Sequence, residues 1–272
     1  MLEFPGPRKM VRFLLFINLI FLFQLNGLAK ETLFRHGLRD TGEVALTFDD
    51  GPHPLYTPLL LKILKSRGIL ATFFVVGERV QQFPALADRM AQEGHELGNH
   101  GFSHKNMTGL SLTEVHRELE KTFVLIKMHT GQKVHLFRPP GGQYNRAILK
   151  CIEGMGYTMV LWEINPSDWK TSSEDILRRV GKSIKPGDII LLHDGSMATL
   201  NALPPLIDYI QEKGLRFVTV GALRQRVLAK EAEQKRKETL ALVRKKVKLT
   251  KDKGSSLRAY EEIVKLERSE KK

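Results

Sequence analysis

The chain has 272 residues, enough for one ample domain or two small ones. Hydrophobic residues make up 42% and charged residues 27%, which is close to the average of globular domains and excludes a disordered or polytopic chain. The formal net charge of +13 divides into +3 in residues 1–30, +2 in residues 31–224 and +8 in residues 225–272. Nucleic-acid enzymes usually carry their excess charge on the folded domain, so the nearly neutral middle argues against a nucleic-acid partner.

Residues 1–29 have the pattern of an export signal. Three basic residues precede an apolar run over 13–23, and a small-x-small triplet ends at Ala29. The apolar run is shorter than the ~20 residues needed to span a bilayer. We expect a cleaved signal peptide, with an uncleaved anchor and a buried helix as the alternatives. The protein is then expected to be exported, and to act in the periplasm, the cell envelope or the extracellular space.

Between the two ends, apolar runs alternate with amphipathic segments, which predicts parallel strands covered by helices in a barrel or a doubly wound sheet. A catalytic domain is expected over 38–224. Five glycines are expected just past helix ends, and Ser111 stands three residues before Glu114 in a capping-box spacing. The expected strands are 44–48, 71–76, 96–99, 136–138, 158–162, 188–192 and 216–220. The expected helices are 57–66, 78–92, 112–129, 145–155, 173–184 and 200–213.

Polar side chains cluster where the expected strands end, the place where such folds carry their chemistry. Asp49 and Asp50 follow the first strand, and two adjacent carboxylates repel each other unless a cation or a donor takes up the charge. His100 and His104 follow the third strand, four residues apart. Two histidines with one carboxylate would leave open positions for water and substrate, as in a catalytic metal site.

Three later strand ends carry further candidates. Arg138 can pair with a carboxylate and keep it ionised, and the following Pro-Pro-Gly-Gly turn offers bare backbone for a close N–H contact, although it is also ordinary turn chemistry. Asp168 can orient a histidine, and Trp169 offers a stacking face for a sugar ring. His193 directly follows an apolar strand, which places it as a general acid.

With these residues the sequence resembles the polysaccharide deacetylase family, which includes nodulation-type chitooligosaccharide deacetylases and peptidoglycan deacetylases. The resemblance runs from about residue 44 to residue 220. It rests on five motifs in order: Thr47-Phe48-Asp49-Asp50-Gly51-Pro52, His100-x-x-x-His104, Arg138-x-Pro140-x-Gly142, Asp168-Trp169 and Leu191-Leu192-His193-Asp194.

The resemblance implies a distorted (β/α) barrel with about seven parallel strands. It implies a metal-dependent hydrolase that removes N-acetyl groups from amino-sugar glycans of the chitooligosaccharide or peptidoglycan type. Asp49 would be the general base, steadied by Arg138, and His193 the general acid, tuned by Asp168. A divalent metal, zinc first and otherwise cobalt or another ion, would be held by Asp50, His100 and His104. Substrate contacts would come from Pro140, Gly141, Gly142, Trp169 and Leu191.

Two positions depart from the family pattern, and two other functions compete with deacetylation of a glycan. Gly141 stands where the family often has Tyr, and Asn165 stands where it often has an acid, so substrate preference is less well defined than reaction type. An amide or O-acetyl ester hydrolase on the same scaffold is one alternative. A catalytically silent wall-binding protein is the other, and the intact set of acids and histidines argues against it.

Residues 225–272 are rich in Lys, Arg and Glu with thinly spread apolar residues. They predict a basic helical tail, broken into two halves at Gly254. Such a tail is either a solvated extension or an arm that holds the protein near an anionic cell-wall polymer or membrane surface. Because aromatic residues do not interleave its charges, the tail gives no support to a nucleic-acid partner.

Overall fold

The computed structural model describes the backbone of residues 32–251 and the side chains of residues 32–242. The expected signal segment and the expected break at Gly254 lie outside the described residues. The described chain divides into two compact units after Arg226. Within the described part, no helix is long and apolar enough to cross a membrane.

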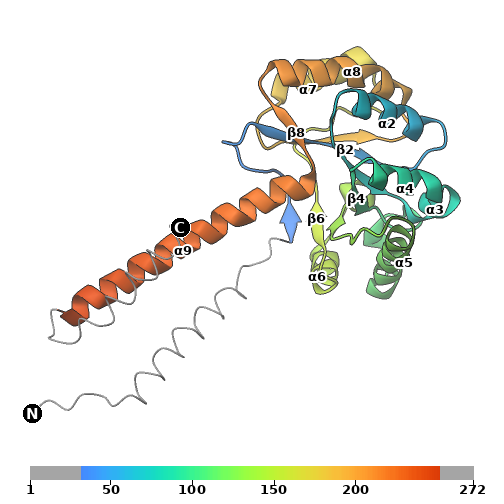
Figure 1. Cartoon of the computed structure of the whole chain (residues 1–272). Helices are drawn as coiled ribbons and strands as arrows, with labels where there is room; N and C mark the ends of the chain where they lie inside the picture. The colour runs from blue at the N-terminus through green and yellow to red at the C-terminus, as the bar shows by residue number, and fades with distance from the viewer. Residues whose placement is uncertain (1–31, 252–272) are drawn as a thin grey trace, which may run out of the picture. The chain divides into compact units, whose positions relative to one another are not determined.

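Eight strands of the first unit pair in parallel, in the order β1-β6-β5-β4-β3-β2-β7, and β8 pairs with β2 (Figure 1). Two isolated bridges, Ile164 with Ile190 and His36 with Asp188, join the chain beyond β6 and β1 to β7. The two edges of the sheet are therefore joined, which gives the expected distorted barrel. The strands are β1 (Leu33–Phe34), β2 (Glu43–Asp49), β3 (Thr72–Val75), β4 (Glu96–Asn99), β5 (Leu136–Phe137), β6 (Thr158–Val160), β7 (Ile189–His193) and β8 (Arg216–Val218).

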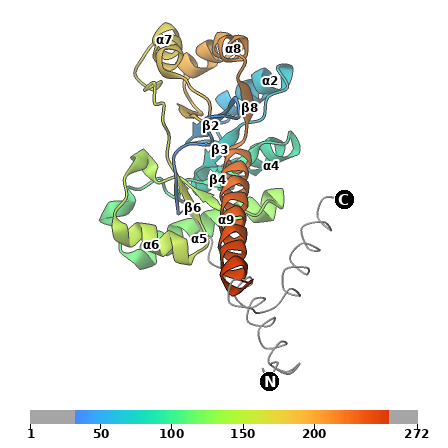
Figure 2. The ribbon, with the colours of Figure 1, turned by 90° about the vertical axis from the view of Figure 1, so that its left-hand side faces the viewer.

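Helices surround this sheet, as Figures 1 and 2 show. They are α2 (Tyr56–Ser66), α3 (Gly77–Gln82), α4 (Pro84–Gln92), α5 (Leu112–Thr130), α6 (Arg146–Gly154), α7 (Ser173–Ser183) and α8 (Met197–Glu212), with the 3-10 turns η1 (Met107–Gly109) and η2 (Pro140–Gly142). A further helix, α9 (Val220–Lys251), begins in this unit and continues into the second.

Strand β2 is the centre of the core and is buried along its whole length. It pairs with β7 on one side and with β3 and β8 on the other, so both of its faces and both of its edges are covered. The ring of Phe48 stacks on Phe73 of β3 at 5.0 Å between centroids. This burial fixes the end of β2, where Asp49 stands.

Most of the expected elements are present, although some ends differ by two or three residues: α8 begins at Met197 and not at 200, and strands β6 and β8 each end two residues early. The predicted capping signals are confirmed. The capping box is formed, since Ser111 N donates to Glu114 Oε2 at 2.8 Å and Glu114 N donates to Ser111 Oγ at 3.3 Å. The expected cap glycines all have positive φ and are Gly68, Gly94, Gly131, Gly156 and Gly214.

Two expectations about elements were wrong. The region 78–92 was expected as one helix, but the chain leaves the helical conformation at Phe83, because Pro84 has no N–H to continue it and instead begins α4. Strand β1 was not expected, since its two residues are too few to show any periodicity.

The helical tail begins at Val220, five residues before the expected boundary. Its first turn is held by side chains of the sheet: Val220 N donates to Thr72 Oγ1 and Gly221 N to Glu96 Oε2, both at 2.9 Å. Arg226 Nε lies 2.7 Å from Oε2 of Glu43, whose side chain is buried at the start of β2. The start of α9 therefore belongs to the first unit, and a domain boundary at 224 falls inside this helix.

Candidate active site

Asp49 and Arg138 form a buried ion pair at the carboxyl end of β2. Arg138 Nη1 donates to Asp49 Oδ1 at 2.7 Å and to Thr47 Oγ1 at 2.8 Å. The guanidinium is fully buried and lies over the ring of Phe74 at 4.1 Å. It also donates to the backbone carbonyls of Val160 and Leu161 at the end of β6. Arg138 thus occupies Oδ1 of Asp49, while Oδ2 lies 3.7 Å from His100 Nε2 and faces the histidine cluster.

Asp50, His100 and His104 bring one oxygen and two nitrogen atoms together within 4.8 Å of one another. Asp50 Oδ1 lies 3.3 Å from His100 Nε2 and 3.0 Å from His104 Nε2, yet this buried oxygen has no hydrogen-bond donor in acceptable geometry. Such convergence without good hydrogen bonds fits ligands around a shared cation. The three residues therefore fit a divalent metal, with positions left for water and substrate.

The tautomer of His100 and the charge of Asp50 suit a metal, whereas the proton favoured on His104 would have to leave when a metal binds. His100 Nδ1 lies 2.7 Å from the carbonyl oxygen of Arg138, so Nδ1 carries the proton and Nε2 keeps its lone pair. Burial opposes ionisation of Asp50, but the two imidazoles outweigh it and hold its pKa far below the usual range. The Asp50 carboxylate raises the pKa of His104 in turn.

His193 and Asp168 form a second pair, on the neighbouring strand β7. Asp49 and His193 are paired in the register of β2 and β7, so both lie at the same edge of the sheet. His193 Nδ1 lies 2.7 Å from Asp168 Oδ1, and Asp168 Oδ2 accepts the backbone N–H of His193 at 2.8 Å. Burial lowers the pKa of His193, but Asp168, with smaller contributions from Asp49 and Asp50, outweighs burial and raises it above the ordinary value.

A cavity of about 780 Å³ opens beside these groups and is lined by Asp50, Asp168, Trp169 and His193 among others. The Trp169 ring lies edge to face against His193 at 4.9 Å and remains 53% exposed. Its open face is available to a ligand, which is unusual for so large an apolar side chain.

The other expected substrate contacts do not line this cavity. Leu191 is buried within β7, and Pro140 is buried in η2. Gly141 has φ of +64° and open space around the position of a Cβ, so its backbone conformation, and not crowding, favours glycine. At Gly142 a Cβ would lie 2.6 Å from the ring of Trp162, so the chain passes too close for any side chain. Their contact with substrate stays a prediction.

Some side chains that position these groups were not expected from the sequence. Thr199, in the first turn of α8, donates to Asp168 Oδ2, and Ser196 Oγ donates to the Asp168 carbonyl at 3.0 Å. Thr47 had a visible signal, because it is a polar residue inside a buried strand two positions before Asp49. Asn165, one of the two departures, accepts the N–H of Ser167 at 2.8 Å and so shapes the turn leading to Asp168.

An arginine-held carboxylate, an Asp-His-His cluster and a histidine–aspartate pair at one end of a parallel barrel are the parts of a metal-dependent hydrolase. Comparison with known proteins identifies the family within this class. The polysaccharide deacetylase family profile matches residues 37–160. The chain belongs to the polysaccharide deacetylase family.

Three relatives illustrate the likeness. A peptidoglycan-N-acetylglucosamine deacetylase of Bacillus cereus is 39% identical over 66% of this chain and 87% of its own length. A chitooligosaccharide deacetylase of Azorhizobium caulinodans is 32% identical, over 71% of this chain and 90% of its own. A crystal structure of a peptidoglycan N-acetylglucosamine deacetylase, in complex with 4-naphthalen-1-yl-N-oxidanyl-benzamide, superposes with a TM-score of 0.70 at 34% identity, covering 71% of this chain and 93% of the other.

Proposed function

We propose that this protein removes N-acetyl groups from amino-sugar glycans of the peptidoglycan or chitooligosaccharide type. The observation that carries the proposal is the meeting of three groups at one edge of the sheet: the Asp49–Arg138 pair, the Asp50–His100–His104 cluster and the His193–Asp168 pair. The exposed ring of Trp169 at the cavity supports a sugar as the ligand, in preference to a small amide held in a closed pocket.

The residues have separate parts in the hydrolysis. A divalent ion held by Asp50, His100 and His104, with zinc as our first choice, would polarise the acetyl carbonyl and acidify a water molecule. Asp49 takes a proton from the attacking water at Oδ2, because Arg138 occupies Oδ1. The new C–O bond forms at the acetyl carbon first, and the C–N bond breaks in the following step.

His193 supplies the proton that the leaving nitrogen needs. Its Nδ1–H is directed at Asp168, so Nε2 is the atom that delivers a proton to the departing amine. The products are acetate and a free amino sugar. Without this proton the nitrogen would leave as an amide anion, and the addition of water would reverse.

Acetate release from defined glycans tests the proposed function. The zinc-loaded protein should release acetate from N-acetylglucosamine oligomers or from peptidoglycan, measured by an enzymatic acetate assay. O-acetylated xylan and a small N-acetyl amide serve as comparison substrates. Release from those two alone would replace the proposal with an ester or amide hydrolase, and release from none of them at saturating zinc would contradict it.

The Asp168–His193 pair predicts the alkaline limit of activity. A general acid works only while protonated, so activity falls as the pH rises through the raised pKa of His193. In Asp168→Asn the lowering effect of burial is no longer opposed by that carboxylate, and we expect the alkaline limb of kcat to move to lower pH. The pH profile of kcat measures this. Asp175→Asn, an exposed carboxylate on α7 that pairs with Arg178, is the matched control. An unmoved alkaline limb in Asp168→Asn would show that Asp168 does not tune the acid.

We further propose that the protein is exported, and that the basic tail holds it near an anionic envelope surface. The tail is removed most cleanly after Ala229, because a cut at 224 would also remove Arg226, the partner of the buried Glu43. Deleting 230–272 should weaken salt-sensitive binding to sacculi or anionic vesicles and leave kcat on soluble oligomers unchanged. Co-sedimentation at low and high salt measures the binding. Undiminished binding by the shortened protein would refute this role for the tail.

A further inference from the structure

The loop between the two histidines of the cluster adopts a conformation that its own residues do not favour. His104 has φ of +56°, in the left-handed region that side chains other than glycine avoid. The imidazoles of His100 and His104 nevertheless face each other with centroids 5.1 Å apart. A backbone of this kind persists only where its surroundings hold it.

One side of the loop is held by the start of α3. Gly77 N donates to the carbonyl of Gly101, and Glu78 N donates to the carbonyl of Phe102, both at 2.9 Å. These N–H groups have no partner inside their own helix, because the first turn of a helix leaves them free. The carbonyl groups of the loop are thus satisfied by backbone.

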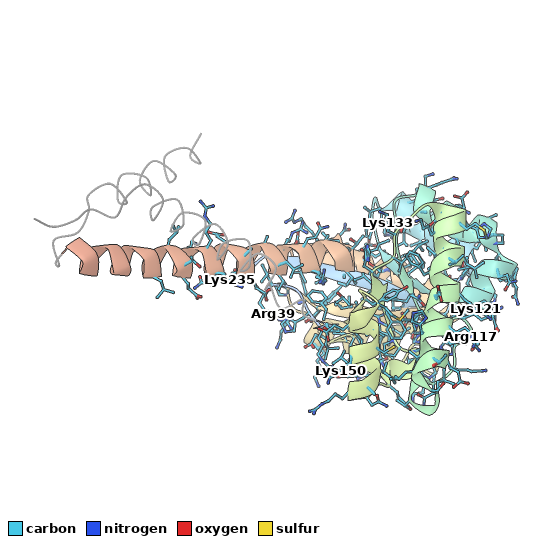
Figure 3. The ribbon with its side chains drawn as sticks, turned by 90° about the horizontal axis from the view of Figure 1, so that it is seen from below. Arg39, Arg117, Lys121, Lys133, Lys150 and Lys235 are labelled. Atoms are coloured by element: carbon cyan, nitrogen blue, oxygen red, sulfur yellow. The ribbon has the colours of Figure 1, made fainter. Side chains whose placement is uncertain are left out.

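On the other side, Asn99 Oδ1 accepts the N–H of Gly101 at 2.9 Å, and the next N–H groups of the loop are held by Glu118 of α5. Its Oε2 accepts the N–H groups of Phe102 and Ser103, and its Oε1 accepts the hydroxyl of Ser103, all three at 2.8 Å. Lys121, one turn further along α5, lies with Nζ 4.7 Å above the ring of Phe102, and Figure 3 shows this residue on the helix. One carboxylate therefore takes up three donors of the five-residue segment that carries both histidines.

We propose that Glu118 is a positioning residue that sets the affinity of the site for its divalent metal by holding the loop between His100 and His104. The inference rests on the proposed metal site, and it assigns no contact of Glu118 with the metal or the substrate. Outer partners that orient metal ligands typically change affinity by about 10–100-fold when removed. Glu118 acts on the backbone between two ligands, and so it orients both at once.

Substitutions at Glu118 separate hydrogen bonding from charge. In Glu118→Leu all three hydrogen bonds are lost, and we expect zinc to bind about 10–100-fold more weakly. In Glu118→Gln the amide oxygen can still accept both N–H groups, while its NH₂ donates to the Ser103 hydroxyl, which also acts as an acceptor. The glutamine variant should therefore keep most of the affinity. Glu120→Leu is the matched control, since Glu120 is two residues away on α5, is exposed and pairs only with the exposed His116 in the described residues.

The measurement is the zinc dissociation constant of the metal-free full-length protein, obtained by competition with a chromophoric chelator. Saturating zinc should restore kcat of the leucine variant with KM unchanged, which a loss of folded protein would not allow. If wild type and variants all release no acetate, the proposed function fails, but the order of their zinc affinities still tests this inference.

Two results would overturn the inference. The first is a leucine variant that binds zinc as tightly as wild type. The second is a glutamine variant that binds zinc as weakly as the leucine variant, because the effect would then come from the charge of Glu118 and not from its hydrogen bonds. Should the leucine variant fail to fold, Glu118→Asp decides. Its carboxylate is one methylene shorter and cannot reach the loop, so weaker zinc binding supports the proposal and wild-type affinity refutes it.

Discussion

Replacing Asp49 by asparagine is expected to lower kcat for acetate release by about 10³- to 10⁴-fold, the upper part of the range for general base catalysis. The amide cannot take up the proton of the attacking water, although its oxygen can still accept the hydrogen bond from Arg138. Glycan binding should persist, because Asp49 is not among the residues lining the cavity beside Trp169.

The substitution also removes the counter-charge of a fully buried guanidinium. Leaving a buried charge unpaired typically costs about 3–5 kcal/mol, and the remaining hydrogen bond puts the expected loss at the lower end. The melting temperature of each variant is therefore measured as well, and kcat values are compared well below it, where the protein is folded. Asp88→Asn, on the surface of α4, should change neither rate nor stability. Turnover within tenfold of wild type in Asp49→Asn would remove Asp49 from the role of base.

Replacing either histidine of the cluster by alanine should abolish stoichiometric metal binding. Three converging ligand atoms would become two, and the surviving pair would be an ordinary carboxylate–imidazole contact. Metal content after dialysis against zinc, measured by elemental analysis, is the readout. His116→Ala, an exposed histidine on α5, should retain the metal of wild type.

The two variants should differ in stability, because His100 is 2% exposed whereas the side chain of His104 is 47% exposed. Removal of the buried ring leaves a cavity and an unpaired Arg138 carbonyl, so only His100→Ala should unfold at a clearly lower temperature. Stoichiometric zinc in either variant would show that the ligand set is assigned wrongly.

The sequence was informative about the site because parallel strands deliver their carboxyl ends to one edge of a sheet. Five of the seven expected strands ended in residues able to do chemistry, so Asp49, His100, Arg138 and His193 could be placed together before any geometry was known. The structure brings these residues together, and their roles remain proposals for the experiments above.

Residues that hold the site from a distance could not be found in the same way. Thr199 of α8 and Glu118 of α5 are of residue types that are common on helices, so the sequence does not single them out. Only the packing of these two helices brings Thr199 to Asp168 and Glu118 to the backbone of Phe102. Arg226 was assigned to a solvated tail for the same reason, although it pairs with a buried carboxylate. The helix break at Phe83 could have been predicted from Pro84, which follows it directly. The contacts of Glu118 and Arg226 join residues far apart in the sequence, so no local pattern predicts them.

The total burial of Arg138 has a consequence for when the protein becomes active. Its buried charge is balanced by Asp49 at the end of β2, whereas Arg138 directly follows β5, far along the chain. The pair cannot form in either half alone, so the ion pair that holds the proposed base forms only when the barrel closes. A chain cut between β4 and β5 is therefore expected to release acetate only if its two parts reassociate. Acetate release by the unsubstituted chain would then report that the barrel has closed.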